Sequence, residues 1–419
     1  MSINIPKGTK DILPDQIYKW NYVESIFLDL CRKYGFKEIR TPSFEHTELF
    51  ARGVGDTTDI VEKQMYTFKD YAGRSVTLKP EGTSCIVRSF IEHKMYADVQ
   101  PSKFCYDISC FKYEKPQSGR LREFHQLGVE VFGTDNTLAD SEVITLAADY
   151  FKILGIRELE LHINSIGCPV CRKKYREALQ QFLKPKYDEL CDTCKNRYER
   201  NPMRILDCKS PICQEHSAGA PVMLDYLCEE CQSAFDSLKN NLNNSGVDFT
   251  VDPGIVRGLD YYTKTAFEFV STDIGAQGTV CGGGRYDNLI EEIGGPPLPG
   301  VGFALGIERL LLVMDSAGIE IPEPDTPDVF IAVMGDRAKS FGLKLMRTLR
   351  NSGLSAEMDL LGRNFKGQFK YADRINAKNT VVIGDNELDM QKVAIKNMKT
   401  SNQVEVPIGE ILSTLTLKK

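Results

Sequence analysis

The sequence lacks the segments that mark membrane-bound and secreted proteins. None of its apolar runs reaches the roughly eighteen residues that a membrane-spanning helix needs. Its amino terminus, MSINIPKGTKDILPD, has no charged start followed by an apolar core and a cleavage site, so no secretory signal is expected. Internal repeats and low-complexity tracts are absent as well. These absences favour a globular protein of the cytoplasm with no membrane partner.

Disulfide bonds are not expected either, although the chain has thirteen cysteines. Thiols are kept reduced in the cytosol, which argues against a disulfide framework. Eight of the thirteen cysteines fall between Cys168 and Cys231. The remaining proportions, 42% hydrophobic and 26% charged residues, are ordinary for a globular protein. A length of 419 residues predicts two or three compact units.

The net charge of −6 offers little support for a nucleic-acid partner until its distribution is considered. Residues 328–419 carry 15 Lys and Arg against 10 Asp and Glu, a net of +5, which leaves −11 on the first 327 residues. A polyanion could therefore dock on the tail and be repelled elsewhere. A solvated basic face is an equally common interpretation of such a tail.

Three prolines within residues 321–327 divide the chain, because proline favours extended backbone and ends helices. After this linker, strand patterns alternate with helix patterns. The strands are expected at 328–335, 354–360 and 379–387, and the helices at 338–353 and 365–377. Such alternation is typical of a small α/β domain with a mostly parallel sheet.

Before the linker, glycine-punctuated strand patterns lie on both sides of a cysteine-rich, helix-like segment. The strand patterns include SVTLKPEG, HQLGVEVFG, TAFEFV and GFALGIERLLLVM, whereas CRKKYREALQQFL has a helical pattern. We predict a β-rich domain in two parts, 1–167 and 247–322, interrupted by an insertion at 168–246. A separate carboxy-terminal domain is predicted at 328–419.

The segment 111–133, FKYEKPQSGRLREFHQLGVEVFG, crowds cations and carboxylates around a Pro-Gln-Ser-Gly loop. The charged residues are Lys112, Lys115, Arg120, Arg122, Glu114, Glu123 and Glu130. This mixture suits a hairpin that binds a nucleoside triphosphate, because the cations meet phosphates and the carboxylates bind amines or metal. An ordinary charged hairpin is the alternative, and composition alone favours it.

Two further segments have residues suited to a ligand pocket. In PGVGFALGIERLLL, glycines precede Glu308 and Arg309 at the start of a helical pattern, where backbone can approach a ligand and the arginine can reach a purine or phosphate. VRGLDYYTKTAFEF and CGGGRYDNL contain paired tyrosines that could line a pocket for a flat polar side chain. A tight turn and ordinary core packing are the alternatives for the two segments.

Together these segments resemble the signature motifs of class II aminoacyl-tRNA synthetases, and the chain is similar nearly end to end to the histidyl-tRNA synthetase family. The similarity includes PKGTKDILP, YGFKEIRTPSFEHTELFARGVGDTTDIVEKQMYTF and TLKPEGT, and RGLDYY and GGGRYD are specific to this family. The resemblance implies an α+β fold with an antiparallel-sheet catalytic domain, a helical insertion and a carboxy-terminal α/β anticodon-binding domain. It also implies a homodimer joined partly around Thr41 and Pro42.

The implied reaction is ATP-dependent activation of L-histidine to histidyl-adenylate, followed by transfer to the 3′ end of tRNA(His). The resemblance assigns histidine binding to Glu81, Gly82, Thr83, Gln126, Glu130, Arg257, Tyr261, Tyr262 and Tyr286. It assigns ATP binding to Lys112, Glu114, Arg120, Phe124 and Arg309. Arg257 would contact the α-phosphate, Arg309 would lie near the γ-phosphate and adenine, and Mg²⁺ would bridge phosphates. Lys112, Arg257 and Arg309 are thus the predicted catalytic residues.

Lys112 departs from the family pattern, in which an arginine forks onto the α-phosphate and the substrate carboxylate. Lysine keeps the charge but loses the bidentate geometry. Lys79 and Lys115 also stand where arginine is usual. We therefore predict that adenylation survives but is slower than in relatives with arginine.

The insertion contains three Cys-x-x-Cys pairs and a looser fourth pair. These cysteines are Cys168, Cys171, Cys191, Cys194, Cys228 and Cys231, with Cys208 and Cys213 as the looser pair. Such spacing suits tetrahedral zinc, and eight thiols could serve two Cys₄ sites. The alternative is a set of buried small residues whose metal site is decayed or absent.

Two other functions fit parts of the sequence. Some relatives have lost aminoacylation and act as regulatory subunits in histidine biosynthesis, but they usually lack the carboxy-terminal domain and have eroded motifs. Here only Lys112 favours that alternative. A nucleic-acid-binding module without catalysis would explain the basic tail, where FKGQFKYADR is expected to touch the anticodon loop. It would leave the glycine-arginine and paired-tyrosine segments without a purpose.

Overall fold

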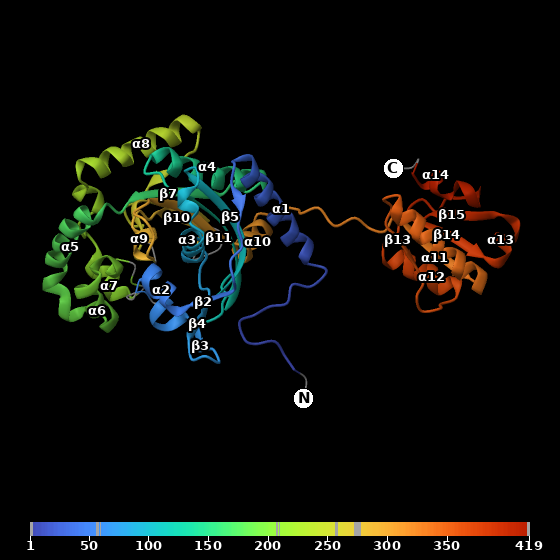
Figure 1. Ribbon diagram of the computed structural model, residues 1–419, viewed down its shortest axis with the longest axis horizontal. Coiled ribbons are helices and arrows are strands. Elements are labelled where there is room, and N and C mark those ends of the chain that lie inside the picture. The colour runs from blue at the N-terminus through green and yellow to red at the C-terminus, as the bar shows by residue number, and fades with distance from the viewer. Residues whose placement is uncertain are drawn as a thin grey trace. The chain divides into compact units, whose positions relative to one another are not determined.

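The structure is a computed structural model, and it describes residues 3–55, 58, 60–206, 208, 210–255, 259–271 and 278–416. Its contacts divide the chain into two compact units, Met1–Ile321 and Pro322–Lys419. Each unit has its own apolar core. Figure 1 shows the helices and strands of both units. Among the described residues, no helix has the length and apolar character needed to cross a bilayer.

The first unit is built on an eight-stranded sheet in the order β1-β5-β6-β11-β10-β9-β7-β8. Its strands are β1 (Lys37–Glu38), β5 (Ser102–Phe111), β6 (Glu123–Phe132), β7 (Leu159–Ser165), β8 (Thr250–Val251), β9 (Thr263–Ser271), β10 (Thr279–Arg285) and β11 (Gly300–Gly306). The outermost pairs, β1 with β5 and β7 with β8, are parallel. The pairs between them are antiparallel. The predicted α+β fold with an antiparallel catalytic sheet is therefore confirmed.

Helices and a small second sheet surround the large sheet. The helices are α1 (Ile17–Lys33), α2 (Thr47–Val54), α3 (Thr83–Glu92), α4 (Thr137–Ile153), α9 (Leu289–Glu292) and α10 (Ile307–Ser316), with shorter helical turns at Ile60–Gln64 and Met95–Ala97. The small sheet has the order β2-β4-β3, from Phe44–His46, Ser75–Leu78 and Tyr66–Lys69. Helix α4 begins where the side chain of Asn136 accepts a hydrogen bond from the N–H of Leu138.

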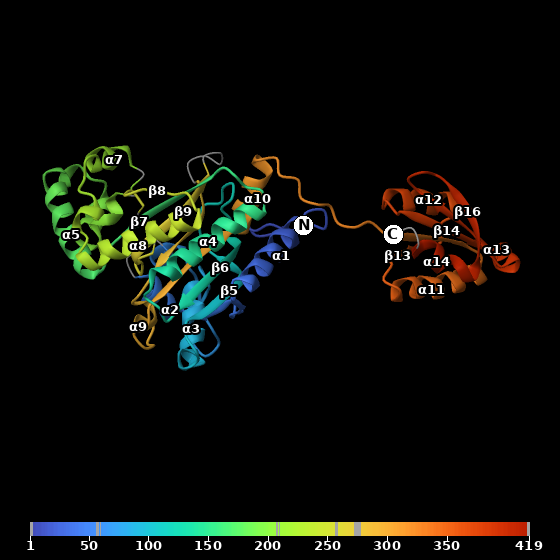
Figure 2. The same cartoon turned by 90° about the horizontal axis from the view of Figure 1, so that it is seen from above.

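Alternation along the strands gives the large sheet two different faces. Leu127, Val129 and Val131 of β6 point into an apolar core shared with α1 and α4. Figure 2 shows these two helices on the same face of the sheet. Glu130 and, on β5, Tyr106 point to the opposite face, where α3 and a group of tyrosines lie. The strand period therefore places the buried acid among hydroxyl groups rather than in the main core.

The insertion leaves the sheet after β7 and returns to it before β8. It consists of α5 (Pro169–Leu183), α6 (Asp192–Arg200), α7 (Pro211–Ser217) and α8 (Glu229–Ser245), with 3₁₀ turns η3 (Lys184–Glu189), η4 (Pro202–Ile205) and η5 (Met223–Tyr226). The helices α5, α6 and α7 gather at one end of the first unit in Figures 1 and 2. Helix α8 runs back along α4 and ends at Gly246, whose φ of 71° suits a glycine.

The second unit is a five-stranded sheet in the order β13-β12-β14-β15-β16, flanked by helices. Its elements are β12 (Val329–Met334), α11 (Asp336–Asn351), β13 (Ala356–Met358), α12 (Phe365–Arg374), β14 (Asn379–Gly384), α13 (Asp385–Met390), β15 (Lys392–Asn397), β16 (Gln403–Pro407), a 3₁₀ turn Ile408–Glu410 and α14 (Ile411–Thr416). The predicted strands and helices are present, and β13, β12 and β14 are parallel, but the strand predicted at 379–387 ends at Gly384, directly before α13.

The prediction of a mostly parallel sheet is wrong for the rest of this unit. Strands β15 and β16 add two antiparallel pairs, so the sheet is mixed. Only the short segment 385–391 joins β14 to β15. A parallel crossover needs a dozen or more residues, so the chain has to turn back beside β14.

Candidate active site

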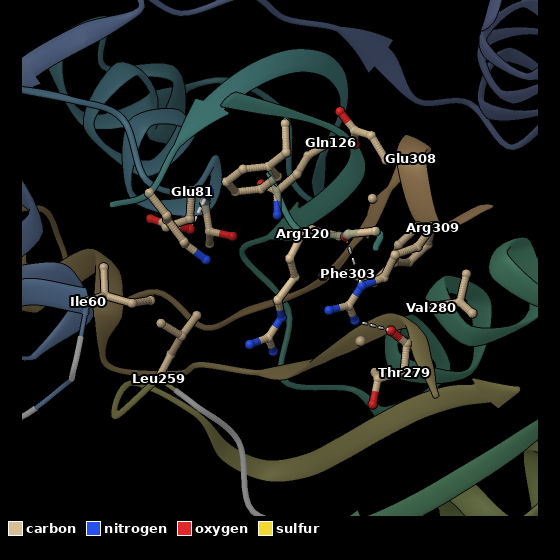
Figure 3. Close-up of a pocket in the computed structure, with 18 of the residues that line it drawn as sticks. Ile60, Glu81, Arg120, Gln126, Leu259, Thr279, Val280, Phe303, Glu308 and Arg309 are labelled. Carbon is tan, nitrogen blue, oxygen red and sulfur yellow. Dashed lines mark hydrogen bonds between the residues drawn. The ribbon is translucent and has the colours of Figure 1, made fainter. Parts of the chain in front are cut away.

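A cavity of about 350 Å³ lies between the β5–β6 hairpin, α3 and the start of α10. Most of the predicted site residues line it: Glu81, Thr83, Lys112, Glu114, Arg120, Phe124, Gln126, Tyr261, Tyr262, Tyr286 and Arg309. Gly82 and Glu130 lie directly behind this lining. Arg257 lies outside the described residues. Figure 3 shows Glu81 and Gln126 at one side of the cavity, and Arg120 and Arg309 pointing into the same space.

Glu130 lies behind Thr83 and Tyr286, which line one end of the cavity, and only 1% of the residue is exposed. Its carboxylate accepts hydrogen bonds from the hydroxyls of Thr83 at 2.8 Å, Tyr106 at 3.0 Å and Tyr286. Burial raises the pKa of Glu130 to about 8, although these three donors favour the charged form. Burial also raises the pKa of Tyr286, which keeps that hydroxyl protonated and able to donate. The result is an acid poised to change charge near neutral pH.

Two glycines provide the space that Glu130 occupies. Gly302 of β11 is the strand partner of Glu130, and a Cβ there would lie 2.0 Å from Oε2 of that carboxylate. Gly128 of β6 is the partner of Tyr106, and a Cβ there would lie 2.3 Å from the tyrosine ring. Both positions therefore require glycine, because the side chain of Glu130 or Tyr106 occupies the space that a Cβ would need.

Glu81 is fixed at the amino-terminal end of α3. Its two carboxylate oxygens accept hydrogen bonds from the N–H groups of Thr83 and Ser84, each at 2.8 Å. A carboxylate in this position is stabilised by the partial positive charge of the helix start. A Cβ at Gly82 would lie 2.7 Å from the Tyr106 ring, so the glycine lets the loop pack against β5. Glu81 is therefore held rigidly at the edge of the cavity.

Three tyrosines form an apolar wall beside the two acids. The ring centroids of Tyr261 and Tyr262 are 4.7 Å apart, and those of Tyr261 and Tyr286 are 5.5 Å apart. The edge-to-face arrangement of Tyr261 and Tyr286 is a favourable one for aromatic pairs. A flat ring carrying polar nitrogens could lie against such a wall with its nitrogens toward the carboxylates.

The opposite end of the cavity is cationic. Arg309 donates from Nη1 to the carbonyl of Thr279 at 2.6 Å and from Nε to the carbonyl of Gly119 at 3.4 Å. Burial lowers the pKa of Arg309, and the positive charge of the nearby Arg120 lowers it further. Arg120 is within 3.3 Å of the Glu114 carboxylate. Two guanidinium groups thus share this end of the cavity, and the charges of Glu114 and Glu268 act on Arg309 there.

Lys112 lies between these two ends of the cavity. Its Nζ is 5.2 Å from the centre of the Phe124 ring, in a cation–π contact. Burial lowers the pKa of Lys112, and the charge of Glu114 opposes that shift. The backbone of Lys112 is held in the hairpin, because its N–H donates to the carbonyl of Arg122 at 2.8 Å. The ammonium group therefore faces the cavity from a fixed strand position.

Arg285, which the sequence places beside Tyr286, does not belong to the cavity. It is 1% exposed and forms an ion pair with Asp140 of α4. It also donates to the carbonyl of Thr134 at 2.9 Å. Adjacent residues of a strand point to opposite faces, so Arg285 ties α4 to the sheet while Tyr286 lines the cavity.

Several residues of the site were missed from the sequence. Tyr106 supplies a third hydroxyl to Glu130, and the glycine at 128 inside a strand was a signal of that close approach. Glu308 accepts hydrogen bonds from the backbone and ring nitrogens of His125, at 3.1 and 3.0 Å, which ties α10 to β6. No local sequence signal joins His125 to an acid so distant in the chain.

The eight predicted cysteine ligands come together in two groups of four. One group is Cys168, Cys171, Cys228 and Cys231, and the other is Cys191, Cys194, Cys208 and Cys213. Both groups lie in the insertion rather than in the cavity.

Comparisons with known proteins agree with this geometry. The model of the histidyl-tRNA synthetase family matches residues 8–310, and the model of an anticodon-binding domain matches residues 328–418. The histidine–tRNA ligase of Caldanaerobacter subterraneus subsp. tengcongensis is 59% identical over 411 residues, which are 98% of this chain and 99% of the relative. The histidine–tRNA ligase of Clostridioides difficile is 52% identical, with 100% of both chains covered.

A solved structure is also similar over the whole chain. The apo histidyl-tRNA synthetase of S. aureus superposes with a TM-score of 0.85 at 42% identity, covering 99% of this chain and 100% of that one. Sequence relatives, family models and a solved structure thus agree along both units. The chain belongs to the histidyl-tRNA synthetase family.

Proposed function

We propose that the chain is a histidine–tRNA ligase, which uses ATP to convert L-histidine to histidyl-adenylate and then charges tRNA(His). The observation that carries the proposal is the charge polarity of one cavity. Glu81 and Glu130 lie at one end, among tyrosines, and Arg120 and Arg309 lie at the other. Histidine with its ammonium and imidazole suits the first end, and a triphosphate suits the second.

At the acidic end, Glu81 and Gln126 face the substrate ammonium, and Tyr261 and Tyr262 lie along the imidazole. The imidazole N–H reaches the Glu130 carboxylate by replacing one of its hydroxyl donors, those of Thr83 and Tyr286 being nearest the cavity. A buried acceptor that needs a donor rejects apolar side chains of similar size.

At the cationic end, Arg309 and Arg120 hold the β- and γ-phosphates while Phe124 stacks on adenine. Lys112 reaches the α-phosphate, and we assign Arg257 to the same group from its place in the family motif. Mg²⁺ would supply positive charge at the phosphates, and the Glu114 carboxylate in the cavity is an acidic group that would help to hold it. A metal ion held by either cysteine cluster would not contact the reacting groups, because both clusters lie in the insertion.

The remaining predictions extend the proposal to assembly and location. The division at 1–167, 168–246, 247–322 and 328–419 stays a prediction, as does a homodimer formed near Thr41. The small sheet beside that segment exposes Phe44 and Phe68, which would suit burial by a second chain. A role in supplying protein synthesis supports the prediction that the chain acts in the cytoplasm.

Histidine-dependent exchange of pyrophosphate into ATP tests the activation step. We expect exchange with histidine and none with the other amino acids, because only a working pocket forms the adenylate reversibly. A regulatory subunit that has lost activation, or a nucleic-acid module without catalysis, would show no exchange with any amino acid. Absence of exchange by folded protein would therefore refute the proposal.

A Lys112→Arg substitution is expected to speed activation by roughly three- to tenfold, the worth of about one added hydrogen bond. The present ammonium offers a point charge over the Phe124 ring, whereas a guanidinium could contact phosphate and carboxylate together. The rate of pyrophosphate exchange at saturating substrates measures this. Lys115→Arg, an identical change at an exposed residue outside the cavity, is the control. An unchanged rate for Lys112→Arg would count against the assigned contact.

Replacing Lys366, Lys370 and Arg374 together by glutamine is expected to raise the KM for tRNA by about tenfold or more. These exposed cations recur every four residues along α12, so they form one basic stripe. Pyrophosphate exchange, which needs no tRNA, should stay unchanged. The control replaces three exposed cations of α11, Lys339, Lys344 and Arg347. An equal loss with both triple variants would show that the tail attracts tRNA without the specific face proposed.

A further inference from the structure

The two cysteine clusters have the dimensions of tetrahedral metal sites. Within each cluster all four sulfur atoms lie within 4.8 Å of one another. Cys168 Sγ is 3.5 Å from Cys171 Sγ and 3.9 Å from Cys228 Sγ, and Cys191 Sγ is 3.9 Å from Cys208 Sγ. A zinc–sulfur bond of about 2.3 Å places tetrahedral sulfurs about 3.8 Å apart. A disulfide, by contrast, would need a separation of about 2.05 Å.

Backbone donors support charge on these sulfurs. The N–H of Cys228 points at Cys171 Sγ at 3.1 Å in the first cluster. In the second cluster the N–H of Cys191 points at Cys213 Sγ at 3.4 Å, and that of Ser210 at Cys208 Sγ at 3.5 Å. Zinc binds thiolates, so binding would release the thiol protons and leave two negative charges on each Cys₄ site. Amide donors stabilise that excess charge.

The insertion has few other means of holding its shape. Four of the ten buried residues in its apolar cluster are cysteines, and two of its four α-helices, α6 and α7, have only nine and seven residues. Small units with such limited cores are usually stabilised by disulfides or metal. The first cluster lies at the neck of the insertion, because Cys168 precedes α5 and Cys228 precedes α8. It therefore joins the chain that enters the insertion to the chain that leaves it.

The second cluster encloses a segment that is bonded to Asp260, next to the tyrosine wall of the active-site cavity. Cys194 lies in α6 and Cys208 follows η4, so a metal ion would hold the chain on both sides of residues 195–206. This segment contains Asn201 and Arg204, and Arg204 is 8% exposed. We call residues 195–206 the bridging segment.

The bridging segment is bonded to the residue directly before the tyrosine wall. Asp260 Oδ1 accepts hydrogen bonds from Asn201 Nδ2 at 3.1 Å and from Arg204 Nε and Nη2 at 3.2 and 3.0 Å. The N–H of Asp260 donates to the carbonyl of Val54 at 3.4 Å on its other side. A cavity of only about 40 Å³ remains between these groups and Tyr262. Asp260 is thus held between α2 and the bridging segment.

We propose that each cluster holds one structural Zn²⁺ and that the ion of the second cluster positions the tyrosine wall of the histidine pocket through the bridging segment. The ion fixes the ends of the segment, Asn201 and Arg204 hold Asp260, and Asp260 sets the backbone of Tyr261 and Tyr262. The proposal rests on the assigned function only in naming histidine as the occupant of that pocket.

Metal analysis of protein purified without chelators tests the first half of the proposal. We expect two zinc ions per chain, and one after replacing both Cys194 and Cys208 by alanine. Cys31→Ala changes a buried cysteine outside the clusters and should leave two. Cobalt(II) in place of zinc should give the strong absorption of tetrahedral thiolate coordination. Folded protein with no bound zinc would overturn this half, whether or not the chain activates histidine.

Substrate dependence tests the second half. In pyrophosphate exchange, the Cys194→Ala/Cys208→Ala variant should raise the KM for histidine about tenfold while the KM for ATP and kcat change by less than about twofold. A loss of folding alone would lower the active fraction and so lower kcat, leaving both KM values unchanged. An unchanged KM for histidine in the zinc-depleted variant would overturn the coupling. If wild-type protein shows no exchange, the assigned function is wrong. The proposal of two zinc ions is then still tested independently by the metal analysis.

An Arg204→Gln variant tests the same link without touching the metal. It should keep two zinc ions and still raise the KM for histidine about tenfold, because Asp260 loses the Nε and Nη2 donors of Arg204. Combining it with the cysteine variant should raise KM no further than either change alone, since both act through one contact. Lys173→Gln, a change of an exposed cation in the same insertion, is the control. An unaltered KM in Arg204→Gln, or additive effects in the combined variant, would overturn the proposal.

Discussion

Replacing Glu130 by glutamine is expected to lower kcat/KM for histidine by roughly a hundredfold to a thousandfold. The carboxylate is buried and accepts three hydroxyl donors, so it can exchange one of them for the imidazole N–H of the substrate. Glutamine has the same shape but offers a neutral acceptor and adds an N–H₂ group that faces donors. Exchange of pyrophosphate into ATP at varied histidine concentration measures the loss.

The same residue predicts how histidine binding depends on pH. Burial places the pKa of Glu130 at about 8, so its charged form increases as pH rises from 6.5 to 8. If the charged form binds histidine, the KM for histidine falls roughly tenfold over this range. In Glu130→Gln this part of the dependence should vanish, leaving only the titration of the substrate imidazole. A wild-type KM that does not change with pH would contradict the assigned contact.

The raised pKa of Glu130 also affects the free energy of unfolding, and this effect distinguishes a loss of histidine binding in Glu130→Gln from a loss of folded protein. The folded-state pKa of Glu130 is raised above the ordinary value of 4.5, so the folded chain holds the proton more tightly than the unfolded chain. The stabilising contribution is fully present below pH 4.5 and is lost as pH rises through 8. Glu130→Gln should therefore be no less stable than wild type at pH 8. Glu405→Gln, at an exposed acid of β16, should change neither kinetics nor stability.

The predictions from the sequence succeeded where a local pattern determines structure. The β5–β6 hairpin follows from alternation around the Pro-Gln-Ser-Gly loop, and α10 begins at Ile307, directly after Gly306, as the glycine pattern indicates. The strands and helices of the second unit up to β14 were also expected from their periods. In each case a few neighbouring residues contain the whole signal.

The predictions failed where distant parts of the chain decide the outcome. Arg285 and Tyr286 are adjacent in the sequence, yet one binds Asp140 of α4 and the other reaches Glu130. Only the partner elements show which face holds the cavity. The strand β15 has an alternating pattern of its own, but its direction depends on the short connection after β14. Neither fact is contained in the residues concerned.

For the cysteine clusters too, one part of the arrangement can be predicted from the sequence and another part cannot. The Cys-x-x-Cys spacing predicts metal ligation, but four pairs can be combined into two sites in three ways. The structure combines the outermost pairs, so that Cys168 meets Cys228, while the inner pairs combine around Cys191 and Cys208. That nested arrangement leaves the bridging segment between the inner pairs, where it can reach Asp260. The link to the pocket thus depends on topology and could not be predicted from spacing.

Replacing Arg309 by glutamine is expected to lower the kcat of activation by roughly a hundredfold to a thousandfold. A loss of this size is typical when a preorganised charge is removed from a reacting group. The guanidinium is already held by the carbonyls of Thr279 and Gly119 before ATP binds. It can therefore meet developing charge without reorganising. Gly119 has a φ of 67°, and a Cβ there would lie 3.1 Å from Arg309 Cγ, so the loop closes tightly on this side chain.

The pattern of losses across variants is what distinguishes an Arg309 phosphate contact from general damage. In Arg309→Gln the KM for histidine should stay within about twofold, because the acidic end of the cavity is untouched. Arg309→Lys should recover only a small part of the rate, since an ammonium cannot keep both carbonyl contacts and reach a phosphate as well. Arg347→Gln, at an exposed arginine of α11, should leave exchange unchanged. Nearly full activity in Arg309→Lys would show that charge alone is sufficient and that the fixed geometry is not used in catalysis.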